Sequence, residues 1–301
     1  MVVLAVLVSG CGGGDAGDGA GRETTATTPA SGTTLEALWR APGEDVAVVP
    51  GTSDHRVGAN RISFLVVDKQ GRVVERPTAR VWLARGLKEV PFARATARLQ
   101  PIGVPGGESA GVGGIYVATI TAPTPGKYWF MAEPVGGMKI QALGNVVVAR
   151  KSAAPSVGDR AIPSKTPTLA STGGDLTALT TSRRPDRALY RTSVARALEA
   201  RQPFVVAFAT PQFCQTRTCG PTVDVVSAVR KSQPASGRVQ FIHVEVYADN
   251  DPAKGVNRWV KEWRLPTEPF TYVVDRTGVI RTKLEGAYSV AELERAVAAV
   301  R

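Results

Sequence analysis

The pattern of apolar and polar positions changes character about halfway along the 301-residue chain. In residues 44–150, short apolar or alternating runs are separated by glycine- and proline-rich turns, and no stretch has a helical repeat. The pattern predicts strands at residues 61–67, 79–84, 114–122, 127–133 and 145–149. Short strands at this spacing are typical of an all-β sandwich.

From residue 189 onward, strand and helix patterns alternate. Residues 204–209 form a continuous apolar run, as expected for a strand that is covered on both faces. Residues 256–263 have apolar positions at i, i+3, i+4 and i+7, which is typical of one face of a helix. Ser289 and Glu292 form a capping box before the last apolar repeat. The predicted order is β-α-β-α-β-β-α, preceded by one helix.

The N-terminal residues indicate export. Residues 2–8 are apolar, which is too short a run to cross a bilayer, since spanning requires about 20 residues. The following Ser9-Gly10-Cys11 resembles a bacterial lipobox, in which the signal is cut before a cysteine that is then acylated. The resemblance implies a lipid anchor at Cys11 and a position on the extracytoplasmic face of the cell membrane. No basic residue precedes the apolar run, which an upstream start codon would explain; the alternative is a disordered tail with a free cysteine.

Composition shifts divide the chain into five segments. They are a signal peptide (1–11), a flexible tether (12–43), the β-sandwich (44–150), a linker rich in Pro, Ser, Thr and Gly (151–188) and the α/β domain (189–301). The net charge is +11, but the basic residues are scattered without a run of five. This distribution predicts a solvated basic surface and no nucleic-acid site.

Two regions resemble known families. The β-sandwich is similar to the immunoglobulin-like modules of exported bacterial proteins. In the α/β region, Cys214 and Cys219 follow the first central strand, and Pro269 precedes an apolar strand and an Asp-x-x-Gly turn. Residues 190–301 therefore resemble exported thioredoxin-like proteins, which implies a thioredoxin-like fold with a cis peptide bond before Pro269.

The thioredoxin resemblance implies a thiol–disulfide oxidoreductase without cofactor or metal, acting on exported protein thiols or disulfides with an unknown membrane or extracellular electron partner. It makes Cys214 the nucleophile and Cys219 the resolving cysteine, with Pro269 beside the sulfurs. A helix N-terminus and the neighbouring Arg217 would lower the pKa of a thiol and enlarge its thiolate fraction.

The sequence departs from the thioredoxin pattern in two respects. Four residues separate the cysteines instead of two. Ala207 stands where thioredoxins have a buried carboxylate, and Glu245 on the neighbouring strand is a substitute only if it points inward.

Three alternative functions remain open on the sequence. In a binding or scaffold lipoprotein, the two cysteines would form a structural disulfide. Thr216 and Cys219 resemble the Thr-x-x-Cys of peroxiredoxins, so Cys219 could reduce peroxide while Cys214 resolves. A metal-delivery role would need His243, which lies in an apolar strand, while His55 is expected to be a surface or turn residue.

Overall fold

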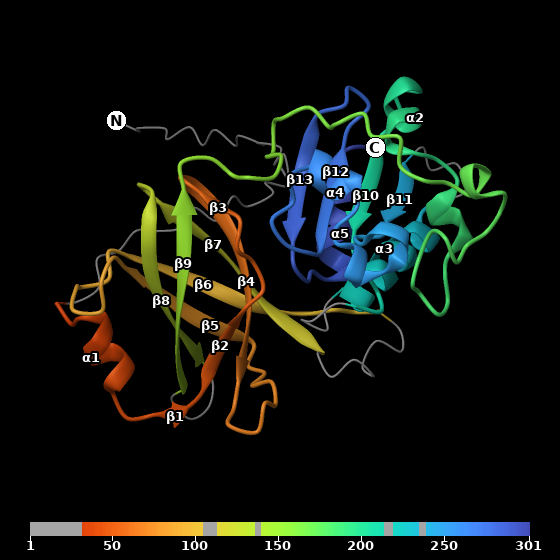
Figure 1. The fold of residues 1–301 in the computed structure, drawn as a ribbon. Helices are drawn as coiled ribbons and strands as arrows, with labels where there is room; N and C mark the ends of the chain where they lie inside the picture. Colours follow the sequence, from red (N-terminus) through yellow and green to blue (C-terminus); the bar gives the residue numbers. More distant parts are fainter. Residues whose placement is uncertain (1–31, 105–112, 136–139, 214–218, 235–238) are drawn as a thin grey trace, which may run out of the picture.

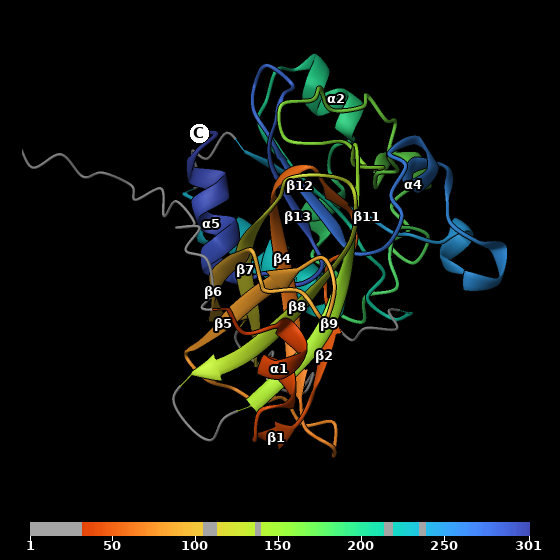
Figure 2. The ribbon, with the colours of Figure 1, turned by 90° about the vertical axis from the view of Figure 1, so that its left-hand side faces the viewer.

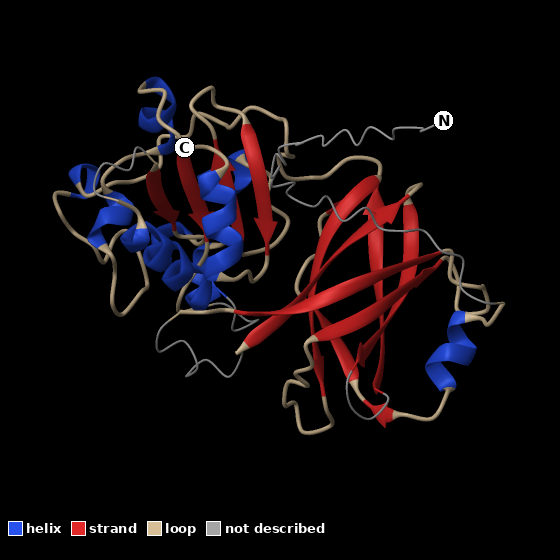
Figure 3. Cartoon of the chain, turned by 180° about the vertical axis from the view of Figure 1, so that it is seen from behind, coloured by secondary structure: helices blue, strands red, loops and turns tan. Residues whose placement is uncertain are grey.

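The computed structural model describes residues 32–104, 113–135, 140–213, 219–234 and 239–301. Among these residues, the chain forms a nine-stranded β unit and a second unit built on a four-stranded sheet with helices (Figure 1). The two units lie side by side and contact each other along the last strand and last helix of the chain (Figures 1 and 3). The molecule is therefore mostly β-structure, with an all-β N-terminal part.

The β unit is one continuous sheet that folds over on itself. Its strands are β1 (Glu44–Asp45), β2 (Ala47–Pro50), β3 (His55–Arg56), β4 (Gly58–Val67), β5 (Thr78–Ala84), β6 (Ala93–Pro101), β7 (Gly114–Ala122), β8 (Gly126–Val135) and β9 (Ile140–Ala149). They follow the order β1-β9-β8-β5-β6-β7-β4-β2, and β3 pairs with β9. Alternate residues face one enclosed core, in which the Phe64 ring lies 5.4 Å from Tyr116 and 5.7 Å from Phe130. The two layers of the predicted sandwich are thus parts of the same sheet.

All five predicted strands of the β unit are confirmed, although most are longer than predicted. The short strands β1, β2 and β3 and the longer strand β6 were not predicted. In β6 the buried positions are small alanines such as Ala95 and Ala97 rather than β-branched or aromatic residues. Residues 35–40, predicted as flexible tether, instead form helix α1 (Leu35–Arg40). Leu35 is fully buried and its N–H donates to the Glu89 carbonyl at 2.9 Å, so α1 is part of the β unit.

The second unit has the predicted order of strands and helices. Its elements are α2 (Val194–Glu199), β10 (Phe204–Phe208), α3 (Cys219–Ser232), β11 (Gln240–Val244), α4 (Arg258–Glu262), β12 (Phe270–Val274), β13 (Ile280–Glu285) and α5 (Val290–Ala298). Short 3₁₀ turns lie at η2 (Ala170–Thr172), η3 (Arg187–Tyr190), η4 (Ala248–Asn250) and η5 (Pro252–Lys254). In the sheet order β11-β10-β12-β13, β10 and β11 are parallel, whereas β12 is antiparallel to both β10 and β13.

Both faces of the four-stranded sheet are covered by helices. On one face, Val205 and Val273 pack with side chains of α3 and α5. On the other, Phe204 and Tyr272 pack with side chains of α2 and α4 and with the fully buried Trp263, which directly follows α4. Figure 2 shows α5 and α4 on opposite sides of this sheet. This double coverage explains why β10 and β12 are buried at every position.

The segment 151–188 lies along the surface of the second unit, as predicted for the linker, but it also contributes to packing there. Ala154 and Ala161 are buried in the same apolar cluster as β10 and β12. Arg160 forms a β-bridge with Val279, and the Ser164 carbonyl accepts from the Ala195 N–H at 2.9 Å. The segment is therefore held to the second unit by backbone hydrogen bonds as well as by apolar contacts.

Candidate functional site

One edge of the four-stranded sheet carries the predicted site residues that the structure describes. The parallel strands β10 and β11 end there, and β12 begins there, because Phe208 pairs with Phe270. Thr210, Glu245 and Pro269 lie directly beyond these strand ends. These residues are distant in the sequence but lie at one edge, because the neighbouring parallel strands β10 and β11 end there.

The cysteine segment itself is only partly described. Cys214, Thr216 and Arg217, like the lipobox residue Cys11, lie outside the described residues. Cys219 is the first residue of α3, and its side chain is also outside the described part. The helix α3 follows β10 and packs against β10 and β11, so its first turn belongs to the edge at which β10 ends.

Glu245 points into the protein at this edge, which is the condition that the sequence analysis set for it. Its side chain is buried, with 4% of the residue exposed. Oε1 accepts from the Thr181 N–H at 3.1 Å, from the Thr210 hydroxyl at 3.2 Å and from the Thr181 hydroxyl. Oε2 is buried and has no hydrogen-bond partner among the described residues. Burial raises the pKa of Glu245 to about 7, and the bonds from the two threonines only partly oppose this.

A second carboxyl group lies next to Pro269. The Tyr247 hydroxyl donates to Glu268 Oε1 at 3.4 Å, while Oε2 is buried without a partner in the described part of the chain. Burial raises the pKa of Glu268 to about 7, and its negative charge also contributes to the raised pKa of Glu245. The Glu268–Pro269 peptide bond is cis, as the sequence resemblance implied, and Pro269 is buried. The edge therefore carries two carboxyl groups that can gain or lose a proton near neutral pH.

His243 is not available to a metal ion. Its Nδ1 lies 2.7 Å from the Tyr190 hydroxyl and its Nε2 lies 3.0 Å from the Ala209 carbonyl, so both ring nitrogens have partners. Complete burial lowers its pKa to about 4, which keeps the imidazole neutral. The residues that the structure describes contain no group of three or more His, Cys, Asp and Glu placed to hold a metal ion.

Ala207 is fully buried in the face of β10 that packs under α3. The buried carboxyl group of Glu245 lies directly after β11 and not on β10. His55, expected at the surface, is also buried, and its Nε2 lies 3.2 Å from the Thr52 hydroxyl.

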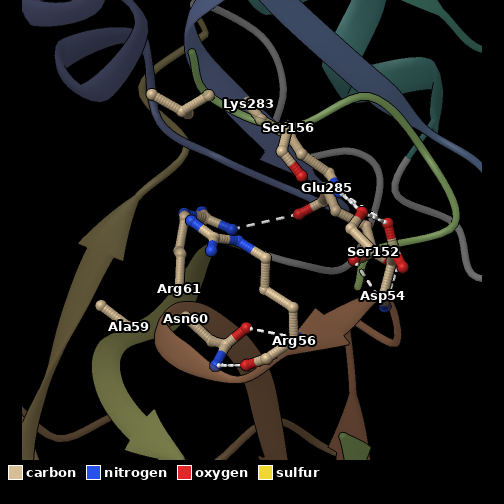
Figure 4. A pocket seen from close by; sticks show the side chains of 10 residues that line it. Asp54, Arg56, Ala59, Asn60, Arg61, Ser152, Ser156, Lys283 and Glu285 are labelled. Atoms are coloured by element: carbon tan, nitrogen blue, oxygen red, sulfur yellow. Dashed lines mark hydrogen bonds and ion pairs between the residues drawn. The ribbon is translucent and has the colours of Figure 1, made fainter. Parts of the chain in front are cut away.

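A polar cluster joins the two units next to this edge (Figure 4). Glu285, at the end of β13, accepts from the Ser53 N–H and hydroxyl, both at 2.8 Å, and from the Thr267 hydroxyl at 3.0 Å. Lys283 Nζ lies 2.6 Å from Asp54 Oδ2 and 2.7 Å from the Ser152 hydroxyl. Asp54, Lys283 and Glu285 are among the residues that line a cavity of about 190 Å³ between the units.

Arg61 of β4 makes the most extensive contact across the junction. Its guanidinium binds the Glu292 carboxylate through two bonds, of 2.7 and 2.9 Å, and also donates to the Glu285 and Ala287 carbonyls. Ser289 caps α5 as predicted, accepting from the Glu292 N–H at 3.0 Å. The Glu292 side chain, however, binds Arg61 rather than completing the capping box. Sequence reasoning missed the junction because partners such as Arg61 and Glu292, or Asp54 and Lys283, lie more than 200 positions apart and form no motif.

A smaller, mainly apolar cavity of about 160 Å³ lies between the junction and the edge. Val49, Leu65 and Ile115 of the β unit line it together with Glu268 and Gly286. The β unit therefore contributes part of the surface next to the Pro269 loop.

Comparisons with known proteins leave the family open. No family model matches the chain, and no curated protein matches it. Among solved structures, it is similar to the Lin-41 filamin domain at 11% identity, over 40% of this chain and 99% of that one, with a TM-score of 0.23. Domains 4 and 5 of the S-layer protein SbsC match at 18% identity, over 36% of this chain and 53% of that one, with a TM-score of 0.18. Scores this low carry no argument about fold or function.

No helix in the described part of the chain has the length and apolar character needed to cross a membrane.

Proposed function

We propose that this chain is an extracytoplasmic thiol–disulfide oxidoreductase, lipid-anchored to the cell membrane at Cys11. In this proposal the second unit is thioredoxin-like and the β unit is immunoglobulin-like. Cys214 and Cys219 exchange a disulfide with the thiols or disulfides of exported proteins.

The observation that carries the proposal is Glu245. A buried carboxyl group with one unpartnered oxygen is costly, and the residues that the structure describes give Oε2 of Glu245 no hydrogen-bond donor. It lies at the edge where the helix beginning with Cys219 starts. A carboxyl group with a pKa near 7 is suited to accept and return a proton at neutral pH. The sheet order and the helices on both of its faces support the thioredoxin-like assignment.

The chemistry follows from these groups. The Cys214 thiolate attacks a substrate disulfide, forming a mixed disulfide and releasing one substrate sulfur as a thiolate that takes a proton. Cys219 gives its proton to Glu245, and the resulting thiolate attacks the Cys214 sulfur. The second substrate sulfur leaves as a thiolate and takes the proton from Glu245. The two electrons have come from the Cys214 and Cys219 thiol groups, which end as a disulfide. In the opposite direction the same steps oxidise a substrate dithiol. Arg217 and the helix N-terminus favour the thiolate, and Thr216 lies between the two cysteines.

The test is turnover of a disulfide substrate by the full chain. Insulin reduction with dithiothreitol as the electron source should be lost in Cys214→Ser and in Cys219→Ser. In Glu245→Gln, the rate near pH 7 should fall by about tenfold or more, because proton transfer by a positioned carboxyl group typically contributes at least that much. Glu199→Gln, which removes an exposed carboxylate of α2, is the matched control and should leave the rate unchanged.

The alternatives give different results. If Cys214 and Cys219 form a structural disulfide, its reduction potential will lie below about −300 mV and insulin will not be reduced. If the chain is a peroxidase, hydrogen peroxide will produce a sulfenic acid at Cys219 rapidly, and Cys214→Ser will trap it. Either result would overturn the proposed oxidoreductase.

A further inference from the structure

A hollow of about 570 Å³ lies at the edge of the four-stranded sheet opposite to Cys219. At that edge β12 ends at Val274 and β13 begins at Ile280, and α2 lies nearby at the top of Figure 1. Three separate parts of the chain line the hollow, and each contributes one arginine. They are the segment before α2 (Arg160, Ala161, Pro163), the end of α2 (Leu198, Arg201) and the turn between β12 and β13 (Arg276, Thr277, Gly278).

The backbone holds each of these arginines in place. Arg160 forms a β-bridge with Val279, and its guanidinium donates to the Thr277 carbonyl at 3.1 Å. Arg201 has a positive φ of 49° directly after α2, and its N–H donates to the Leu198 carbonyl at 3.1 Å. Arg276 lies in the tight turn that the Gly278 N–H closes on the Asp275 carbonyl at 2.9 Å. The three side chains therefore start from fixed points around one hollow.

The neighbouring carboxylates are engaged elsewhere. Asp275 accepts from the Thr277 and Val279 N–H groups and pairs with Arg281 at 2.5 Å, bonds that outweigh desolvation and lower its pKa to about 2. Glu199 pairs with Arg196 at 3.3 Å. Among the described residues no carboxylate lines the hollow. Three arginines thus line a hollow to which no described carboxylate contributes.

We propose that this hollow binds a phosphate group. The guanidinium fork matches phosphate oxygens with paired hydrogen bonds, and arginines from three directions can surround several of these oxygens at once. Ala161, Pro163 and Leu198 add apolar surface, which suits the organic part of a phosphate ester. A soluble phosphate ester and a phospholipid headgroup present the same chemistry to the site. The proposal is independent of the redox function, since it uses the opposite edge of the sheet.

Calorimetry with pyrophosphate as the probe tests the proposal on the full chain. The triple variant R160Q/R201Q/R276Q should weaken binding by at least about tenfold, because it removes three charge-assisted contacts. The variant R191Q/R258Q/R264Q removes the same charge from exposed positions of the same unit and should bind like the wild type. In the wild type, pyrophosphate should also shift the amide resonances of Thr277 and Gly278, a readout that does not depend on how well the variants fold.

A second arm identifies the source of the phosphate. The full chain is sedimented with phosphatidylglycerol vesicles and, for comparison, with phosphatidylcholine vesicles. Association with phosphatidylglycerol that is lost in R160Q/R201Q/R276Q and kept in R191Q/R258Q/R264Q supports a headgroup ligand. Pyrophosphate binding without site-dependent vesicle association supports a soluble ester. The proposal fails if pyrophosphate does not bind, if both triple variants lose binding equally, or if the shifted amides lie elsewhere.

Discussion

The junction between the units and the open edge of the four-stranded sheet both contain buried carboxyl groups, but the structure treats them differently. At the junction the Asp54 side chain is 5% exposed, and bonds from Lys283, Ser152 and the Ala153 N–H outweigh desolvation and lower its pKa. At the edge Glu245 is similarly buried, but half of its carboxylate has no donor in the described part, and burial raises its pKa to about 7. A satisfied buried charge fixes a structure, whereas an unsatisfied one is available for chemistry.

This contrast also assigns roles to the two units. The junction places β4 and the segment before it against β13 and α5 by ion pairs, backbone bonds and a shared apolar cluster. The β unit is therefore fixed next to the Pro269 loop. Four variants test the contrast.

The largest effect is expected from Gly286→Ala at the junction. A Cβ at Gly286 would lie 1.9 Å from the Gly51 carbonyl oxygen, and the φ of Gly286 is +70°. The two backbones would have to separate, which we expect to lower the free energy of unfolding by about 4 kcal/mol in urea denaturation. Gly71→Ala has a similar φ of +74° but no atom within 4 Å of the added Cβ, so it should cost only about 1 kcal/mol. Equal losses of stability in Gly286→Ala and Gly71→Ala would contradict the close approach of Gly286 to the Gly51 carbonyl.

Lys283→Met tests whether Asp54 depends on its partner. Removal of the ammonium leaves a buried carboxylate unpaired, and we expect a loss of about 3 kcal/mol at pH 7. Because the pKa of Asp54 is lowered in the folded state, its contribution is present above the unfolded value and is lost as the pH falls through the lowered one. The difference between wild type and variant should therefore shrink on going from pH 7 to pH 2. The control Lys254→Met breaks an exposed pair with Asp249 and should cost less than about 0.5 kcal/mol.

Glu245→Gln tests the opposite behaviour at the edge. The pKa of Glu245 is raised on folding, so the stability from its protonated form is present below about 4.5 and is lost as the pH rises through about 7. The amide cannot ionise and keeps an acceptor for the threonine donors. We therefore expect the free energy of unfolding of the variant, relative to that of the wild type, to rise by roughly 2–3 kcal/mol between pH 4.5 and pH 8 in denaturation profiles. If the stability of the wild type and that of the variant change with pH in the same way, folding does not raise the pKa of Glu245.

The smallest effect is expected from Arg61→Met. Its pair with Glu292 is partly buried and has two bonds, so we expect a loss of about 1–2 kcal/mol and faster amide exchange in the first turn of α5. Arg40→Met breaks a one-bond pair with Glu36 at an arginine that is 69% exposed, and it should be nearly neutral. If Arg61→Met changes the free energy of unfolding as little as Arg40→Met does, the Arg61–Glu292 ion pair does not stabilise the junction.

The amino-acid sequence by itself determined the local structure of most elements. Apolar runs and helical repeats predicted β10, β12 and α5 nearly to the residue, because each element buries a face whose period appears in the sequence. The short strands β1, β2 and β3, the strand β6 and the helix α1 were missed. Two to four residues, burial of small alanines and docking of a two-turn helix each leave a weak local signal.

Tertiary structure alone decided which charged groups meet. Glu245 was only a conditional substitute on the sequence, and its inward orientation depends on Thr181, which comes from the segment predicted as a linker. The junction partners Arg61 and Glu292, and the three arginines of the hollow, are far apart along the chain and come together only when the elements pack. Local sequence patterns indicate which residues are buried. Which charged groups pair, and which carboxylate oxygens lack a hydrogen-bond donor, depends on distances in space that no local pattern specifies.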